Sequence, residues 1–449
     1  MADTIAALST PPATAAIGII RLSGPQAHAI INRVFDYKTK PNFTPKTLVY
    51  GTIHATDGNP LDNCLVSFFT APASYTGQDM VEIYCHGGLC LLNTVLETLF
   101  ACGARQAEPG EFTKLAFLSG KLDLSQAEAV IDLIDAETGQ QVKNAAAQLN
   151  GALGKHLAPV IDRLTDITAQ FYAYVDFVDD EIEEIDTVQL IQALDFASER
   201  IAFLADSYIS GQVMSQGVNC AIIGKPNVGK SSLINALSDR ERSIVTSIAG
   251  TTRDVVTQSI NIDGVKLNLA DTAGIHQTED IVENIGIQKA MEQVEKSDFK
   301  LILLDGSQPF DQHDQQVIAL GQEPDIFVIN KGDLPQAADI SELFDKNYIV
   351  VSCKTGSNIQ ELKQLIAQKY MSGQLPLNGQ IITNARHKEL LDRALEFAAT
   401  AKAQAGKNNT LDIILADIEA CTDLLHQILG NKIDDQIVQR IFSRFCVGK

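Results

Sequence analysis

The stretch that most constrains this chain is the loop at residues 224–232, which reads Gly-Lys-Pro-Asn-Val-Gly-Lys-Ser-Ser and fits the pattern G-x-x-x-x-G-K-[ST]. An apolar run at residues 218–223 precedes it, and residues 233–237 have the character of a helix start. A strand–loop–helix unit of this kind directs backbone N–H groups and a helix N-terminus at an anion. Lys230 would reach the outer phosphates of a nucleotide, and Ser231 would hold Mg²⁺ through its hydroxyl. The alternative, a chance glycine-rich turn, does not explain the motifs that follow.

Later motifs indicate which nucleotide this loop would bind. Asp-Thr-Ala-Gly at residues 271–274 follows an apolar strand predicted at residues 265–270, where an aspartate can hold Mg²⁺ through water and a glycine N–H can meet the γ-phosphate. Asn-Lys-Gly-Asp at residues 330–333 follows another strand predicted at residues 326–329. It resembles the guanine-reading N-K-x-D motif, because a carboxylate accepts two hydrogen bonds that adenine cannot donate. Ser-Cys-Lys at residues 352–354 resembles the last motif of the same set. The sequence therefore predicts GTP as the ligand. The predicted GTP-binding residues are Asn227, Val228, Gly229, Lys230, Ser231, Ser232, Thr246, Ser247, Ile248, Ala249, Gly250, Thr251, Thr252, Asp271, Thr272, Ala273, Gly274, Asn330, Lys331, Asp333, Ser352, Cys353 and Lys354.

The sequence lacks the residue that usually orients the attacking water in GTP hydrolysis. Many small GTPases orient the attacking water with a glutamine directly after D-x-x-G, but Ile275 stands there and cannot do so. Arg253 is the nearest candidate for an arginine finger within the chain. The carbonyl of Asn227 would help a monovalent cation to sit beside the phosphates in place of an arginine. The alternative for Asn227 is a turn-former in the left-handed conformation.

Length, charge and cysteine usage set further bounds. A chain of 449 residues with 45% hydrophobic residues has room for about three domains. A net charge of −21 argues against general binding to nucleic acid, so any RNA contact would be local or made through a partner. The eight cysteines include no C-x-x-C pair, which predicts reduced thiols in the cytoplasm rather than a zinc site or a disulfide framework. No secretory signal and no membrane span are expected.

The first segment, residues 1–119, has mixed strand and helix character. Residues 17–22 and 64–69 read as strands, and residues 26–34 and 89–100 as amphipathic helices. His-Gly-Gly at residues 86–88 suggests a tight turn close to a ligand or to another backbone, and a structural turn with a solvated histidine is the alternative. Neither a catalytic triad nor a metal cluster is legible in this segment.

Helical patterns dominate the middle and the end of the chain. Residues 122–149 open with Ser-Gln-Ala-Glu at 125–128, which predicts a capping box. Apolar residues from Leu149 to Phe171 recur every three or four positions, as on one face of a long helix. The acidic run at 176–184 predicts a solvated helix end or loop, with steering of a partner as the alternative. Further helices are predicted at 188–211, 384–404 and 410–429.

These patterns predict a multidomain α/β and α protein. An N-terminal α+β domain would span residues 1–119. A helical domain in two parts, 120–215 and 375–449, would be interrupted by an inserted Ras-like P-loop domain at 216–374, because insertion is tolerated where the ends of a domain lie close together. The lone Cys446 near the end of the chain has three interpretations: a prenylation signal that Gly448 and Lys449 fit poorly, a disordered tail, or a reactive thiol close to a ligand.

With these motifs in view, the chain resembles the MnmE (TrmE) family of tRNA-modification GTPases over essentially its full length. G motifs alone would be shared with several ribosome-assembly GTPases, whereas the flanking segments and the tail are specific to this family. The stretches that carry the resemblance are Asp-Thr-Ile-Ala-Ala at 3–7 with Thr-Pro-Pro at 10–12, Ser-Tyr-Thr-Gly at 74–77, Cys-His-Gly-Gly at 85–88, Pro-Gly-Glu-Phe at 109–112, Leu-Asp-Leu-Ser-Gln-Ala-Glu-Ala at 122–129, the G motifs including 248–254, and Cys-Val-Gly-Lys at 446–449.

The resemblance implies a set of sites and partners. The N-terminal domain would be folate-binding-like, would pair two subunits, and would contact a tetrahydrofolate one-carbon derivative through Arg21, Glu82, Lys121 and Lys449. The G domains would dimerise with K⁺ held at Asn227, Thr246, Ile248 and Thr251, and with Mg²⁺ held at Ser231 and Thr252. Glu283 would orient the water, and Cys446 would serve the modification.

The resemblance also implies a mechanism and a partner. Hydrolysis of GTP between paired G domains would move the helical domain and gate chemistry shared with the FAD protein MnmG. The product would be an aminomethyl or carboxymethylaminomethyl group on the wobble uridine of certain tRNAs. One alternative is a ribosome-assembly GTPase that binds RNA as a switch, although that class predicts a basic RNA-binding module that this acidic chain does not show. Another is a nucleotide-regulated scaffold with negligible turnover.

Overall fold

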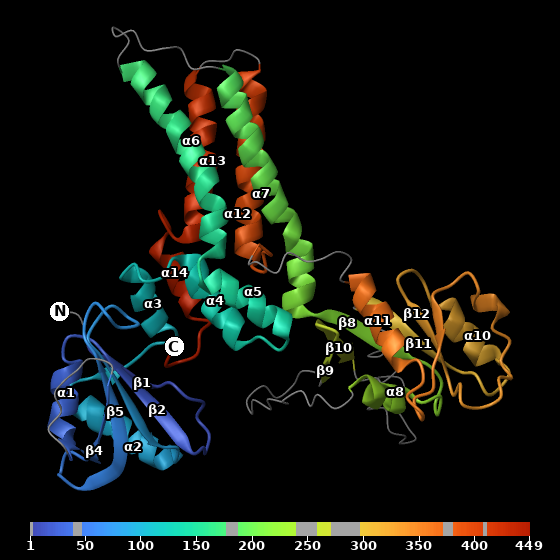
Figure 1. Ribbon diagram of the computed structural model, residues 1–449, viewed down its shortest axis with the longest axis horizontal. Coiled ribbons are helices and arrows are strands. Elements are labelled where there is room, and N and C mark those ends of the chain that lie inside the picture. Colours follow the sequence, from blue (N-terminus) through green and yellow to red (C-terminus); the bar gives the residue numbers. More distant parts are fainter. Residues whose placement is uncertain are drawn as a thin grey trace, which may run out of the picture. The chain divides into compact units, whose positions relative to one another are not determined.

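In the computed structural model the chain divides into two compact units, each of which combines segments that are distant in the sequence. The structure describes residues 3–38, 47–176, 187–238, 258–270, 297–370, 380–406 and 411–449. The first unit comprises residues 1–131, 148–195 and 396–449, and the second comprises 132–147 and 196–395. Figure 1 shows the helices and strands coloured along the chain. The predicted domain bounds at residues 119, 215 and 374 stay predictions.

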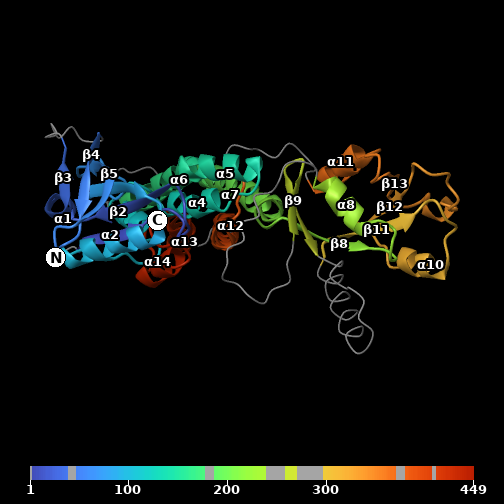
Figure 2. The same ribbon diagram turned by 90° about the horizontal axis from the view of Figure 1, so that it is seen from below.

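The first unit begins with a sheet whose seven described strands follow the order β3-β4-β5-β6-β2-β1-β7. All neighbours pair antiparallel except β1 and β7, which are parallel. Helices α1 and α2 of the N-terminal segment are drawn in Figure 2. Their apolar side chains, such as Ile31 and Leu99, are buried in one core with residues of the sheet. The elements are β1 (Ile5–Leu8), β2 (Ile17–Ser23), α1 (Ala27–Val34), β3 (Phe35–Tyr37), β4 (Leu48–His54), β5 (Pro60–Phe69), β6 (Met80–His86), α2 (Leu89–Ala101) and β7 (Arg105–Gln106).

The remaining elements of the chain's first half and its end are helical, as the sequence predicted. Helices α4, α5, α7 and α12 contribute residues to both units. The predicted helices at 188–211, 384–404 and 410–429 are confirmed with slightly different bounds. The helices are α3 (Glu111–Leu118), α4 (Leu124–Ile134), α5 (Gly139–Leu149), α6 (Ala152–Asp176), α7 (Thr187–Gln216), α12 (Ala385–Ala405), α13 (Leu411–Leu429) and α14 (Asp435–Phe442).

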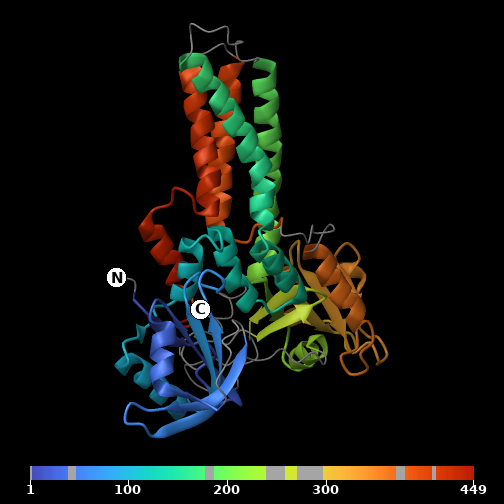
Figure 3. The ribbon, with the colours of Figure 1, turned by 60° about the vertical axis from the view of Figure 1, so that its left-hand side comes forward.

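The predicted apolar stripe forms the buried face of α6. Its buried residues are Leu153, Leu157, Ile161, Leu164, Ile167 and Phe171. Helix α13 packs beside α6 in both Figure 1 and Figure 3, and Tyr172 donates a hydrogen bond to Glu419 across the pair at 2.7 Å. Leu149 ends the preceding helix, so the stripe is shared between α5 and α6 rather than continuous.

The capping box predicted at Ser125 and Glu128 is wrong, because α4 begins at Leu124, two residues earlier than that pattern implies. Asp123 accepts a hydrogen bond from the Gln126 N–H at 2.8 Å, and Gln126 Oε1 accepts one from the Asp123 N–H at 2.9 Å. This reciprocal pair satisfies the free N–H groups of the first turn. Ser125 instead donates its hydroxyl to Asp123. Two overlapping cap patterns occur in this segment, and the carboxylate is the one used.

The second unit contains a sheet whose six described strands follow the order β13-β12-β11-β8-β10-β9. Strand β8 lies between β10 and β11 and is parallel to both, while only β9 is antiparallel. Helices α8 and α11 cover one face and α10 covers the other. The elements are β8 (Val218–Ile223), α8 (Lys230–Leu237), β9 (Gln258–Ile262), β10 (Val265–Ala270), β11 (Phe299–Asp305), α10 (Gln312–Ala319), β12 (Ile326–Asn330), the 3₁₀ turn Ser341–Leu343, β13 (Tyr348–Val350) and α11 (Ile359–Tyr370).

Burial on both faces explains why the sequence predicted these strands so closely. A parallel strand covered by helices on both sides carries an uninterrupted apolar run. The predicted strands at 218–223 and 265–270 have the bounds of β8 and β10, and the predicted strand at 326–329 is extended by one residue in β12. In a doubly wound sheet a ligand binds at the carboxyl ends of the strands where the strand order reverses. That position is the end of β8.

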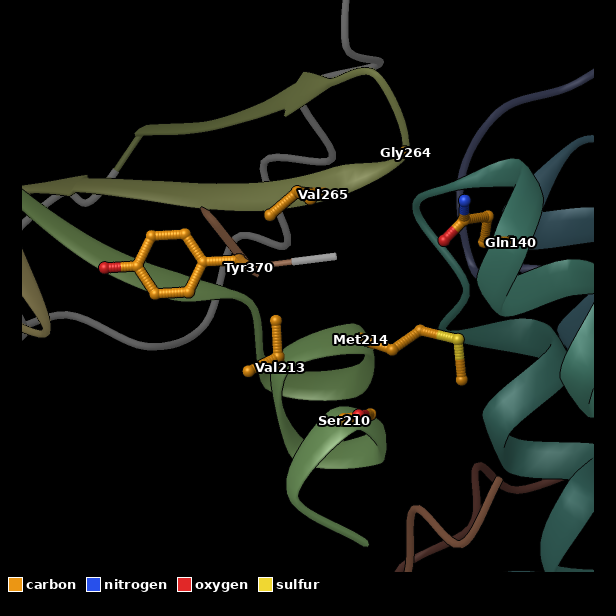
Figure 4. Close-up of a pocket in the computed structure, with 7 residues that line it drawn as sticks. All are labelled: Gln140, Ser210, Val213, Met214, Gly264, Val265 and Tyr370. Atoms are coloured by element: carbon orange, nitrogen blue, oxygen red, sulfur yellow. The ribbon is translucent and has the colours of Figure 1, made fainter. Parts of the chain in front are cut away.

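Gln141, near the start of α5, joins this helix to the end of α7 within the second unit. Thr138 and Gln141 form a reciprocal capping box, and Gln141 Nε2 donates to the Met214 carbonyl at 2.7 Å and to the Ser215 carbonyl at 3.3 Å. Gln141 is 8% exposed. Next to these contacts lies a small pocket between the helices and the β9–β10 hairpin, shown in Figure 4. It is lined by Gln140, Ser210, Val213, Met214, Gly264, Val265 and Tyr370.

No helix in the described part of the chain combines the length and the apolar character needed to cross a membrane.

Candidate functional site

The phosphate loop, residues 224–229, connects β8 to α8 as the sequence predicted. Gly229 has a φ of +105°, and a Cβ at this position would lie 2.3 Å from Nδ2 of Asn330. A Cβ at Gly224 would lie 2.4 Å from the Leu303 carbonyl oxygen of β11. Glycine is therefore required at both ends of the loop, at one end by conformation and close contact and at the other by close contact. The helix that starts at Lys230 directs its N-terminus toward the loop, an arrangement suited to an anion.

Lys230 extends over this loop rather than into solvent. Its Nζ donates hydrogen bonds to the carbonyl oxygens of Gly224 at 2.7 Å and Lys225 at 2.9 Å. Partial burial lowers the pKa of Lys230, because the charged ammonium loses hydration. An incoming phosphate would offer this ammonium a stronger, charged acceptor than either carbonyl. Ser231 and Ser232 follow in the first turn of α8 and are exposed.

Asn330, at the end of β12, ties the phosphate loop to the loop after β13. Its Nδ2 donates to the Val228 carbonyl at 2.8 Å, and its Oδ1 accepts from the Cys353 N–H at 3.1 Å. Asn330 is 4% exposed, so these bonds form away from water. A buried amide that satisfies both of its ends in this way holds the segments in one relative position.

Asp333 stands exposed beside these segments. Its Oδ1 accepts a hydrogen bond from the buried Ser352 hydroxyl at 2.7 Å. That bond, with the positive charges of Lys354 and Lys331, lowers the pKa of Asp333 and keeps the carboxylate ionised. Lys331 has a φ of +66° and pairs with Asp305 at 2.5 Å. An exposed carboxylate held by a second residue can accept two hydrogen bonds from a ring edge such as that of guanine.

Asn227 adopts the left-handed conformation, with a φ of +66°, and its side chain is exposed. Asn227 therefore forms the left-handed turn that the sequence offered as an alternative.

Part of the predicted nucleotide site lies outside the described residues. So do Arg253 and Ile275. The site residues outside the described part are Thr246, Ser247, Ile248, Ala249, Gly250, Thr251, Thr252, Asp271, Thr272, Ala273, Gly274 and Glu283. In the part that is described, no group of three or more His, Cys, Asp or Glu side chains is arranged to hold a metal ion.

A second polar cluster lies on the sheet of the first unit, on the face opposite α1 and α2. Arg21 and Glu82 are cross-strand neighbours on β2 and β6, and Arg21 Nε and Nη2 both donate to Glu82 Oε1, at 3.0 and 2.8 Å. The Tyr84 hydroxyl donates to Glu82 Oε2 at 2.7 Å. Burial and the adjacent Glu82 carboxylate raise the pKa of Tyr84 to about 12, so its hydroxyl stays a donor at neutral pH.

Aromatic rings surround the Arg21 guanidinium. Its Cζ lies 5.4 Å from the centre of the Tyr75 ring and 5.6 Å from that of Phe112, within the range of cation–π contacts. The Tyr75 hydroxyl shares a 3.0 Å hydrogen bond with Thr113. Lys121 lies near the same loop, since a Cβ at Gly77 would lie 3.8 Å from Lys121 Cε. The cluster therefore combines a cation, a carboxylate and flat apolar walls.

The last residues of the chain pack against this neighbourhood. The carbonyl oxygens of Cys446 and Lys449 accept hydrogen bonds from the Gly110 and Phe112 N–H groups at 3.3 and 3.1 Å. Gly448 has a φ of +95°, and its carbonyl accepts a bond from Ser9 Oγ at 3.0 Å. Cys446 itself is exposed. The disordered-tail interpretation is therefore wrong, because the tail's backbone is paired with ordered segments.

The histidine turn at residues 86–88 approaches another backbone. A Cβ at Gly87 would lie 2.3 Å from the Ala15 carbonyl oxygen, and the Ala15 N–H donates to the Gly87 carbonyl at 3.1 Å. The His86 side chain is 74% exposed and its Nδ1 lies 2.7 Å from Asp62 Oδ1. The close approach to another backbone is confirmed, and the exposed His86 side chain also fits the alternative, a structural turn with a solvated histidine.

Three side chains of the first-unit cluster were not predicted from sequence. Tyr75 and Phe112 lie inside motifs that carried no assigned role, and Tyr84 was not singled out. A signal for Tyr84 was present, because alternate residues of a strand share a face and Glu82 is two positions away. The signal for Tyr75 is tertiary, since its partners come from other elements.

Comparison with known proteins was made against families, curated sequences and solved structures. A family model described as the MnmE helical domain matches residues 124–446, and one described as the GTP-binding protein TrmE N-terminus matches residues 4–121. The "tRNA modification GTPase MnmE" of Acetivibrio thermocellus is 40% identical over 457 residues, covering 100% of this chain and 99% of the relative. The protein of the same name from Natranaerobius thermophilus is 40% identical over 456 residues, with the same coverage. A solved structure of Era from Aquifex aeolicus bound to GDP and AlF4⁻ covers 40% of this chain and 67% of its own, at 28% identity and a TM-score of 0.28.

Proposed function

This chain belongs to the MnmE family of tRNA modification GTPases, and we propose that it couples GTP hydrolysis to modification of the wobble uridine of certain tRNAs. The chain is a GTP hydrolase that acts in tRNA modification. In this proposal residues 216–374 form a G domain inserted into a helical domain, and residues 1–119 form a folate-binding-like domain that pairs two subunits.

The observation that carries the proposal is the tie that Asn330 makes between the phosphate loop and the loop after β13. Because of this tie, the ammonium of Lys230 and the carboxylate of Asp333 belong to segments braced against each other. That arrangement suits a ligand with phosphates at one end and a guanine edge at the other. The remaining predicted GTP contacts keep their proposed roles.

K⁺ and Mg²⁺ are proposed as the cations of the nucleotide site. An exposed serine hydroxyl in the first turn of α8 and an exposed, left-handed Asn227 beside it fit oxygen ligands for hard cations. Ser231 and Thr252 would hold Mg²⁺, and Asn227, Thr246, Ile248 and Thr251 would hold K⁺. Glu283 would orient the attacking water, since Ile275 cannot.

The first-unit cluster is proposed to bind a tetrahydrofolate one-carbon derivative. A guanidinium, a carboxylate and aromatic walls suit a flat heterocycle with a hydrogen-bonding edge, and the cluster offers all three. Arg21, Glu82, Lys121 and Lys449 would contact the folate, which supplies the one-carbon unit. Cys446 would serve the modification, and an MnmG-like FAD protein would join the homodimer as the partner.

The first experiment compares GTP turnover in KCl and NaCl at matched ionic strength. The variants Asn227→Ala, Asn227→Gly and Asn227→Asp separate the two roles of this residue. If Asn227 only forms the turn, its replacement by glycine should leave K⁺-stimulated GTP turnover unchanged, because glycine adopts positive φ freely. A side-chain ligand is lost in glycine and kept in aspartate, which still supplies an oxygen.

We expect strong K⁺ stimulation in the native chain, its loss in Asn227→Ala and Asn227→Gly, and its partial retention in Asn227→Asp. Equal rates in both salts for the native chain would exclude cation-assisted hydrolysis and leave Arg253 or an arginine from a partner as the next candidate. Retention in Asn227→Gly would reduce Asn227 to a turn-former.

Folate binding distinguishes this function from that of a ribosome-assembly switch. Calorimetric titration of the full chain with a reduced folate should show binding that Arg21→Ala abolishes. Arg33→Ala is the matched control, because Arg33 lies on α1, on the covered side of the sheet. Absence of folate binding in the native chain would favour the RNA-binding switch.

A further inference from the structure

We propose that Lys225 is a positioning residue of the nucleotide site, which anchors the phosphate loop to α10 and shields the bound phosphates from two carboxylates. Its Nζ lies 2.6 Å from Asp311 Oδ2 and 2.7 Å from Asp314 Oδ2. In the sequence pattern of the loop, Lys225 occupies one of the four unspecified positions, so the motif assigns it no role. The inference rests on nucleotide binding at this loop, as the proposed function requires.

The two carboxylates are held in place by the start of α10. Asp311 Oδ1 accepts hydrogen bonds from the N–H groups of His313 and Asp314, at 2.8 and 3.1 Å, and the Asp311 N–H donates to Asp314 Oδ2 at 3.1 Å. This capping box fixes both side chains before Lys225 is considered. Lys225 therefore contacts a preorganised pair of carboxylates rather than two mobile side chains.

Asp314 depends on Lys225 for its charge balance. Its side chain is only 7% exposed, and within the described residues Lys225 is the one cation in ion-pair distance of it. A buried carboxylate without a counter-charge is strongly unfavourable. The ion pairs with Asp311 and Asp314 raise the pKa of Lys225, and the pair with Lys225 lowers the pKa of Asp311 to about 2. Lys225 and Asp311 are therefore charged at neutral pH.

The backbone of Lys225 also helps to hold the Lys230 side chain in its observed position. The Lys225 backbone carbonyl accepts a hydrogen bond from Lys230 Nζ at 2.9 Å, while its side chain is bound to α10. The anchor thus fixes a carbonyl that the Lys230 ammonium must leave when phosphate arrives. Without the anchor, the two carboxyl groups would lie next to the phosphate loop without their counter-charge, and the loop would lose its connection to α10.

The test is a double-mutant cycle in the full chain, with dissociation constants for fluorescent GDP and a non-hydrolysable GTP analogue measured at two salt concentrations. Lys225→Gln should weaken binding by about 10- to 100-fold, more at low salt than at high salt, because the carboxylates that lose their pairing with Lys225 repel the phosphates through a partly screened field. Asp314→Asn alone should change binding by less than about threefold, within the range of weakly coupled sites.

The discriminating result is rescue. Combining Asp314→Asn with Lys225→Gln should restore part of the affinity, because it removes the buried one of the two uncompensated carboxylates, and Lys225→Arg should bind almost normally. Lys369→Gln is the control, since Lys369 also pairs with a carboxylate, Glu323, on the same fold. Circular dichroism of each variant establishes that it is folded.

Two outcomes overturn the inference: native affinity in Lys225→Gln, or a folded Lys225→Gln whose loss is insensitive to salt and is not rescued by Asp314→Asn. If Lys225→Gln does not fold, the double variant Lys225→Gln/Asp314→Asn is compared with Asp314→Asn alone. The remaining Asp311 charge should then weaken binding in a salt-dependent way, and equal affinities of the two that are independent of salt would again refute the inference. A native chain that binds no guanine nucleotide would refute the proposed function instead, so the two failures are distinguishable.

Discussion

We expect Gln141 to stabilise the contact between α5 and the end of α7. The substitution Gln141→Glu tests this, because it replaces only the side-chain NH₂ group by an oxygen. The side-chain oxygen Oε1 accepts from the N–H groups of Glu137 and Thr138 at 2.6 and 2.9 Å. A glutamate keeps that oxygen and therefore keeps the capping box. It replaces only Nε2, which donates to the carbonyl oxygens of Met214 and Ser215.

The magnitude follows from the groups that lose a partner. Each of the two donated hydrogen bonds contributes about 1 kcal/mol, and buried acceptors left unpaired add about 1–3 kcal/mol. A carboxylate at a helix N-terminus gains only about 0.5–1 kcal/mol from the helix dipole. The loss is therefore larger than the gain, and we expect the local free energy of opening to fall by roughly 2–4.5 kcal/mol at neutral pH. This corresponds to amide exchange about 30- to 2,000-fold faster.

The loss should depend on pH with a defined sign. Next to two carbonyl oxygens, the carboxyl group introduced by Gln141→Glu can donate to one of them when it is protonated, so its folded-state pKa lies above the unfolded value of about 4.3. A group with a raised folded pKa contributes stability that is present below the unfolded pKa and is lost as the pH rises through the folded pKa. The deficit of Gln141→Glu relative to the native chain should therefore be small near pH 4 and full near pH 7.

The assay is hydrogen exchange of the amides at residues 214–217, compared between variant and native chain at each pH. Gln212→Glu is the matched control, because the Gln212 side chain is exposed on the same helix. Exchange rates within threefold of native at pH 7, or a deficit that grows on acidification, would refute the assignment of Nε2 as the connection.

Three further predictions concern the two candidate sites. Asp333→Asn should weaken GTP binding by about 10- to 150-fold, as expected for lost hydrogen bonds to a charged group, and should favour xanthosine triphosphate, whose ring edge accepts where guanine donates; fluorescence competition measures both. Asn330→Ala should raise the dissociation constant for GDP by at least about tenfold, because two bonds that brace the phosphate loop are lost. Gly448→Ala should release the tail, because the new Cβ would lie 2.1 Å from the Leu8 carbonyl oxygen in a left-handed backbone; thiol labelling of Cys446 and exchange of nearby amides would report it, and unchanged labelling would contradict it.

The parts of the fold that could be predicted are those whose signal is local. Strands β8 and β10 were predicted with their observed bounds because both faces are buried and the apolar run is unbroken. The stripe of α6 was predicted because one face is buried and the other is solvated. Helix α14 was not assigned, since Val438 and Phe442 are buried against Phe117 and α4, which are distant in the sequence.

The candidate sites divide in the same way. The phosphate loop and Asp333 lie in contiguous motifs, so the amino-acid sequence alone identifies their residues. It does not identify the partners of Lys225, because Asp311 and Asp314 have an ordinary local role as helix-capping residues and nothing in their spacing links them to the loop. The capping box at Ser125 was wrong for a related reason: Asp123 offers a competing cap that the pattern alone does not rank.

Strand β10 connects the helical segments near Gln141 to the predicted nucleotide site. Lys266, at the start of the strand, pairs with Glu137 at 2.9 Å, and Asn268 donates to the Gln216 carbonyl at the end of α7 at 2.8 Å. The same strand ends at Ala270, directly before the predicted Asp-Thr-Ala-Gly motif. Because β8 and β9 hold β10 in register on both sides, it cannot slide alone. Any displacement of β10 must therefore move the segments of Glu137 and Gln216 together with the sheet, as long as Gln141 keeps α5 joined to α7. In Gln141→Glu, GTP hydrolysis should therefore stay close to native while tRNA modification per GTP falls, and an equal fall in both would show that the junction serves folding alone.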